Sequence, residues 1–65
     1  MEVEKLRHLL MHWIEHSEEH TRKYEELAEK IKEINPNASE KLKKAVEKFR
    51  EGEYYLKKAI SDLSD

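Results

Sequence analysis

The stretch INPNASE, residues 34–40, interrupts a chain that otherwise consists almost entirely of helix-forming residues. Pro36 is the single proline of the protein. Because the ring of a proline pushes the preceding residue out of the helical region, a first helix should end near Ile34. We therefore expect this stretch to turn the chain back on itself, with one helix on each side.

The residues that follow the proline predict where a second helix begins. Asn37 can act as its N-cap, and Glu40, three residues later, completes the pattern of a capping box. The predicted helices span about residues 2–34 and 37–63. Because a tight turn joins them, they must run antiparallel. The fold class predicted for residues 1–65 is therefore an all-α helical hairpin in a single domain.

Both predicted helices carry an apolar stripe at helical spacing, which indicates the faces that pack against each other. Folding the chain about the turn brings Tyr24 near Phe49 and Trp13 near Ile60, so the aromatic side chains should lie in the core. The stripe of the first helix comprises Val3, Leu6, Leu10, Trp13, Tyr24, Leu27, Ile31 and Ile34. The stripe of the second helix comprises Ala38, Leu42, Ala45, Val46, Phe49, Leu56, Ala59, Ile60 and Leu63.

A chain of 65 residues buries little surface and usually needs a partner chain, a metal ion or disulfides for stability. The sequence has no cysteine, which leaves a partner chain or a metal bound by nitrogen and oxygen. Leu9, Met11 and Ile14 widen the first stripe beyond what one hairpin can cover. We therefore expect a homodimer in which two hairpins form a four-helix bundle.

Polar residues interrupt the two stripes at the same height. Ser17 and His20 occupy stripe positions in the first helix, and Glu53, beside Gly52, lies within the stripe of the second. Burying a carboxylate without a partner is costly, and His20 is the first candidate partner. The sequence therefore predicts a buried polar layer in the middle of the hairpin.

All four histidines fall in HLLMHWIEHSEEH, residues 8–20, at intervals of four. Two histidines four residues apart lie one above the other on a helix and can bind one metal ion. The predicted ligands of a divalent transition metal are His16, His20 and Glu53, with His12 as an auxiliary ligand. Imidazole and carboxylate donors suit nickel, cobalt or zinc. On this interpretation the protein is a metal carrier, store or sensor, and its partners include a metal donor or acceptor protein.

The same residues allow an interpretation without a metal. His20 can hydrogen-bond Glu53 and Ser17 in a buried polar layer that sets the register of the helices. The protein is then a metal-free helical dimerisation or interaction module. His8 is expected to be solvated on the outer face of the first helix.

Composition and motifs disfavour several classes of function. With 13 basic and 15 acidic residues the net charge is -2, so nucleic acid is not expected as a partner. No apolar run approaches the length of a membrane span, and the first residues do not resemble a signal peptide, so we expect a cytoplasmic protein without a membrane partner. The sequence contains no Glu-x-x-His, H-E-x-x-H, serine-elbow or phosphate-loop motif, and we expect no enzyme activity.

The residues LLMHWIEHSEEH also carry a resemblance. They resemble a poorly characterised family of small bacterial and archaeal helical domains with the motif L-x-x-H-W-x-x-H-N-x-x-H. His12, Trp13, His16 and His20 match this motif, whereas Ser17 stands where the motif has asparagine. The resemblance covers about a third of the chain and implies a role in handling nickel or cobalt.

Overall fold

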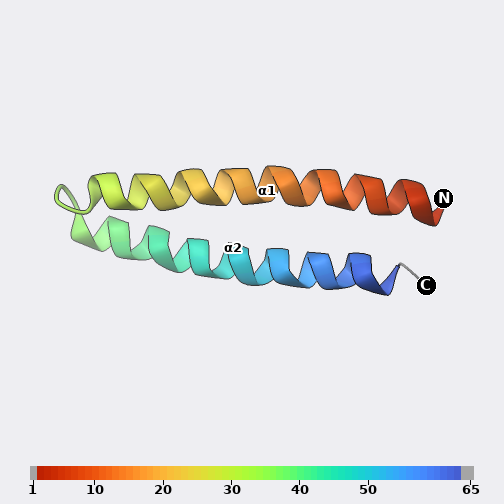
Figure 1. Cartoon of the computed structure of the whole chain (residues 1–65). Helices are drawn as coiled ribbons and strands as arrows, with labels where there is room; N and C mark the ends of the chain where they lie inside the picture. The colour runs from red at the N-terminus through yellow and green to blue at the C-terminus, as the bar shows by residue number, and fades with distance from the viewer. Residues whose placement is uncertain (1, 64–65) are drawn as a thin grey trace.

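A computed structural model describes residues 2–63, which form two helices joined by a short turn. Helix α1 spans Val3–Ile31 and helix α2 spans Pro36–Asp62. They lie side by side and antiparallel in a rod of 48 × 15 × 13 Å (Figure 1). The predicted all-α hairpin is therefore confirmed. Neither helix within residues 2–63 is long and apolar enough to cross a membrane.

The start of α2 differs from the prediction. Asn35, not Asn37, is the N-cap, and its Oδ1 atom accepts a hydrogen bond from the backbone N–H of Ala38 at 3.1 Å. Pro36 is the first residue of α2, where its fixed φ suits the helix and its missing N–H has no helical partner to lose. The predicted cap at Asn37 was wrong because the proline begins the helix instead of preceding it.

The end of α1 also differs, because the helix stops at Ile31 and not at Ile34. The backbone N–H groups of Ile34 and Asn35 both donate to the carbonyl oxygen of Ile31, at 3.0 and 2.8 Å, and so close the turn. A side chain from α2 holds this end of the hairpin together, since Ser39 Oγ donates to the carbonyl oxygen of Ala28 at 2.7 Å.

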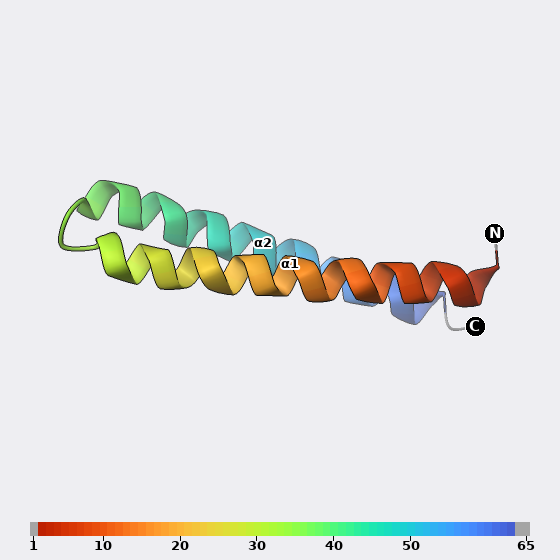
Figure 2. The same cartoon turned by 90° about the horizontal axis from the view of Figure 1, so that it is seen from above.

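The contact between the helices follows a seven-residue repeat. The buried residues of each helix recur at every seventh position and form one line along it. This spacing keeps two helices in contact while they cross at the shallow angle visible in Figure 2. We call these residues the seam; they are Ile14, Thr21 and Ala28 of α1 and Ser39, Val46 and Glu53 of α2.

The seam lies beside the predicted stripe of α1 and not on it. The prediction that the aromatic residues are core residues is wrong for a single hairpin, since Trp13, Tyr24 and Phe49 are 55%, 40% and 45% exposed. Tyr24 and Phe49 nevertheless meet as predicted, with their rings stacked and the centroids 5.7 Å apart. The stripe therefore includes apolar residues that the hairpin leaves uncovered.

Candidate functional site

The middle of the seam contains a buried carboxylate. Glu53 of α2 is 5% exposed, and its Oε2 atom accepts two hydrogen bonds from α1. The donors are Ser17 Oγ at 2.6 Å and Thr21 Oγ1 at 2.7 Å. Hydrogen bonds to a charged acceptor are stronger than those between neutral groups, so they offset part of the cost of burying the carboxylate. We call Ser17, Thr21 and Glu53 the polar layer.

The expected partner of this carboxylate was wrong. Within residues 2–63, Glu53 is bound by the two hydroxyl groups, whereas the side chain of His20 is exposed. The reason is geometric, because Thr21 faces α2 and the preceding residue is turned away from it by about 100°. Sequence reasoning missed Thr21 because packing against α2 buries it and no local feature of the sequence marks it as buried.

The structure places all four imidazoles on exposed surfaces of α1. His12 and His16 lie together, with ring centroids 4.4 Å apart and the rings edge to face. His16 and His20 are exposed while Glu53 is buried in the seam, so these three predicted ligands do not converge within the hairpin. Over the described residues, no group of three or more His, Cys, Asp or Glu side chains is placed to hold a metal ion. The hairpin by itself therefore offers a pair of imidazoles.

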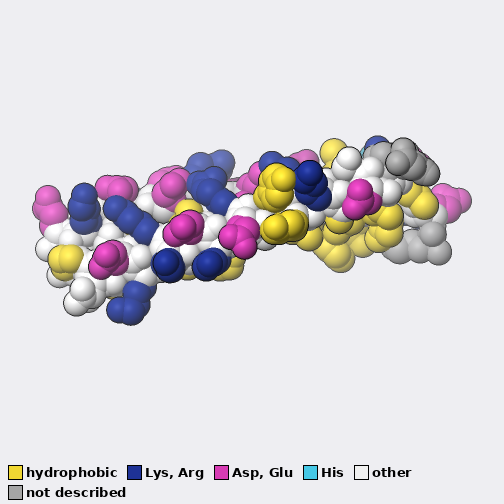
Figure 3. All heavy atoms as spheres, turned by 90° about the horizontal axis from the view of Figure 1, so that it is seen from below, with side chains coloured by type: hydrophobic (Ala, Val, Ile, Leu, Met, Phe, Trp, Pro, Cys, Tyr) yellow, Lys and Arg dark blue, Asp and Glu magenta, His cyan; other side chains and the backbone are white. Residues whose placement is uncertain are grey.

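One side of the hairpin presents apolar side chains outside the seam. They occupy the rows of the seven-residue repeat that lie directly beside the seam, and the Tyr24–Phe49 stack joins the two helices there. In the view of Figure 3, hydrophobic side chains gather in the half that lies away from the turn. We call the side formed by these rows the apolar face; it comprises Leu10, Trp13, Tyr24, Leu27 and Ile31 of α1, Leu42, Phe49 and Leu56 of α2, and Leu63, which follows α2.

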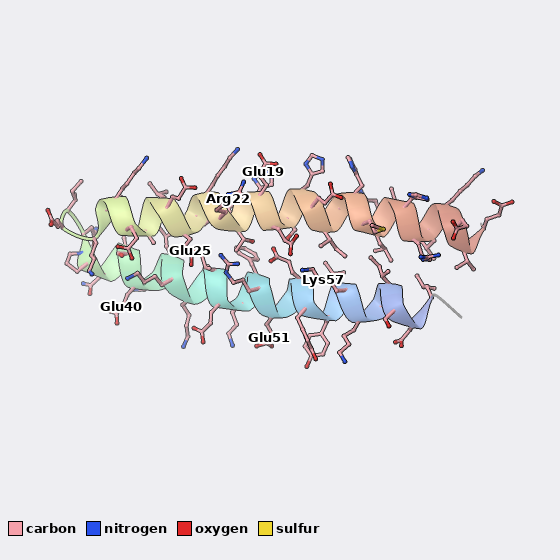
Figure 4. All side chains as sticks on the ribbon, in the orientation of Figure 1. Glu19, Arg22, Glu25, Glu40, Glu51 and Lys57 are labelled. Atoms are coloured by element: carbon pink, nitrogen blue, oxygen red, sulfur yellow. The ribbon has the colours of Figure 1, made fainter. Side chains whose placement is uncertain are left out.

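The opposite side of the hairpin carries ion pairs between the helices. Figure 4 shows Glu25 and Lys57 reaching between α1 and α2, whereas Glu19 points away from α2. Exposed pairs of this kind contribute little to stability, so their main effect is to select which residues lie opposite each other. The pairs join Glu18 to Lys57 at 2.6 Å, Glu25 to Arg50 at 2.8 Å and Glu29 to Lys43 at 3.3 Å.

A shallow recess of about 220 Å³ opens beside the polar layer. Tyr24 and Phe49 supply its aromatic wall, and Ser17, His20 and Thr21 line the rest. Ordinary ligand pockets have volumes of roughly 300–1,000 Å³, so the recess is small for a ligand. Its size suits the side chain of another protein chain.

Comparisons with known proteins give a family without a known activity. Residues 6–63 match the model of a family described as "Domain of unknown function (DUF8180)". The sequence is similar to an uncharacterized protein of Archaeoglobus fulgidus, with 53% identity over 58 residues that cover 89% of this chain and 94% of the relative. No solved structure matches the chain. These findings agree with the resemblance to a family of small helical domains and are silent on its metal association.

Proposed function

The chain belongs to the DUF8180 family, and from its two unlike faces we propose that it is a cytoplasmic, self-associating helical module and not an enzyme. Two copies pack through their apolar faces and form a four-helix bundle. The observation that carries this proposal is the row of large apolar side chains that the hairpin leaves exposed. Contiguous exposed apolar surface on a small protein is typical of an interaction site.

The surface area of the chain supports a partner of similar size. A compact monomer of 7.9 kDa exposes roughly 4,400 Å², whereas this chain exposes 5389 Å². The excess of roughly 1,000 Å² is close to the ~800 Å² per partner that a stable interface buries. A second hairpin laid along the rod therefore covers the right amount of surface.

The polar layer has a clear role within such a bundle. Ser17, which binds Glu53, lies in the same row of the repeat as Tyr24, so the layer borders the apolar face. A polar group inside an apolar interface disfavours shifted alignments, because a shift would place it against apolar side chains. We propose that the layer sets the alignment of the two hairpins.

Sedimentation equilibrium of the purified protein tests the proposal. We expect a mass of twice the 7.9 kDa chain at micromolar concentration, with dissociation on dilution. The helical signal in circular dichroism should fall over the same range of dilution, because a small hairpin depends on its partner for stability. If the measured mass equals that of a single chain at every protein concentration, self-association is refuted.

We propose metal binding as a second function, favoured by the contact between His12 and His16. Their spacing of four residues suits one divalent nickel, cobalt or zinc ion. Two imidazoles leave the coordination incomplete, so water, His20 or a group from a second copy would supply the remaining positions. The protein would then carry, store or sense the ion and exchange it with a donor or acceptor protein.

Thermal melting with and without added metal tests whether the protein binds a metal ion. Nickel, cobalt or zinc at about a hundredfold excess over the dissociation constant should stabilise the fold by about 2.7 kcal/mol and raise Tm. The variant His16→Ala should lose this rise because it breaks the pair. The variant His8→Ala, which leaves His12 and His16 in place, serves as the control. A melting temperature indifferent to every ion and to chelator would remove the metal function and leave the helical module.

A further inference from the structure

Gly52 in the middle of α2 has no explanation within the hairpin. Its φ is not positive, and a Cβ atom built on it would meet nothing within 4 Å. Glycine inside a helix is unfavourable relative to alanine by about fivefold in the folding equilibrium. A glycine kept in such a position is explained when another backbone or a large side chain approaches it closely. No group of the described hairpin approaches Gly52 in this way, so its surface is open to a group from another chain.

The residues in the same row of the repeat as Gly52 are also small. They lie one position before the seam residues of α2 and so border the apolar face. The corresponding row of α1 lies one position before the seam residues of that helix and carries larger side chains. The row of α2 holds Ala38, Ala45, Gly52 and Ala59, and the row of α1 holds Trp13, His20 and Leu27.

The two rows match in height along the rod. Within the hairpin, Thr21 lies level with Glu53 and Tyr24 lies level with Phe49. A two-fold axis parallel to the rod preserves these heights and places α1 of one copy against α2 of the other. Large residues then face small ones at every level. The pairs are Trp13 with Ala59, His20 with Gly52, and Leu27 with Ala45.

We propose, building on the self-association above, that Gly52 is the socket for His20 of a second copy of this chain, and that the two hairpins pair with their turns at the same end. The ring of His20 then enters the interface beside the polar layer of the other copy. The reverse arrangement, with the turns at opposite ends, sets α1 on α1 and therefore large side chains against large ones. It also sets α2 on α2 and leaves Gly52 without a large side chain to receive.

The variant Gly52→Ala tests this contact because it should raise the stability of helix α2 and lower the affinity of the dimer. Alanine favours α2 but its methyl group fills the space needed by His20, so the dissociation constant of the dimer should rise by about tenfold. The control is Glu51→Ala, since Glu51 points away from α1 in Figure 4. Sedimentation equilibrium should give the control a dissociation constant within about twofold of the wild type.

The outcomes separate this inference from the proposed function. A Gly52→Ala dimer that is as tight as the wild type, or tighter, overturns the socket and leaves self-association intact. A wild-type protein that is monomeric removes both. For the orientation, a nitroxide attached at Glu33→Cys in the turn should give a spin–spin distance well below the 48 Å length of the rod. A distance near that length overturns the same-end arrangement.

Discussion

A Ser17→Ala, Thr21→Val double variant should lose most of its folded hairpin. Both substitutions remove a hydroxyl that donates to Oε2 of Glu53 and leave the carboxylate buried without a donor. Each hydrogen bond to a charged group contributes about 1.5–3 kcal/mol, so the expected loss is roughly 3–6 kcal/mol. That loss matches the roughly 3–5 kcal/mol that the core of so small a chain supplies. Urea unfolding followed by circular dichroism, at a fixed protomer concentration, measures the effect.

A third substitution provides the decisive comparison. Adding Glu53→Leu to the double variant removes the unpartnered carboxylate, and replacing a whole polar cluster by apolar groups is close to neutral. The triple variant should therefore recover most of the lost stability. The variant Ser61→Ala, which removes an exposed hydroxyl from α2, should change stability by less than about 0.5 kcal/mol. If the double variant unfolds at the urea concentration of the wild type, the two hydroxyls do not stabilise the buried carboxylate.

The fold could be predicted from the sequence because its signals are local. Pro36 ends one run of helix-forming residues and starts another, and a short turn leaves only an antiparallel arrangement. The helix ends were less predictable, because both Asn35 and Asn37 can cap a helix. In the structure Asn35 is the cap. Its side-chain oxygen accepts a hydrogen bond from the backbone N–H of Ala38, and its own backbone N–H donates to the carbonyl oxygen of Ile31.

The candidate site was predictable only in part, because the apolar pattern does not say which contacts lie within one chain. The stripe of α1 correctly placed Ser17 level with Glu53, and these residues form a hydrogen bond. The same stripe also placed His20 in the core of the hairpin. The stripe is wide because it includes both the residues that face α2 and those of the apolar face, so its centre lies between these two surfaces and not on the seam. The rotation of α1 that buries Thr21 depends on packing against α2, and no local feature of the sequence states that rotation.

The variant Phe49→Glu should abolish dimerisation. Phe49 is 45% exposed in the hairpin, stacks on Tyr24 and lies in the middle of the apolar face. A second copy on this face would bury the new carboxylate without a partner, at a cost of several kcal/mol. At 1.4 kcal/mol for each factor of ten, the dissociation constant should rise by about a thousandfold or more. Sedimentation equilibrium would then give the mass of a single chain across the accessible range of concentration.

Tyr54→Glu is the matched control, because it also replaces an aromatic residue of α2 by glutamate and adds the same charge. Tyr54 is 54% exposed, packs edge-on against Tyr55 and lies outside the apolar face. We expect this variant to dimerise as the wild type does. Circular dichroism of both variants separates loss of the dimer from loss of the helices themselves. If Phe49→Glu dimerises as tightly as Tyr54→Glu, the second copy does not bind to the apolar face. The exposed apolar side chains of that face then need another explanation.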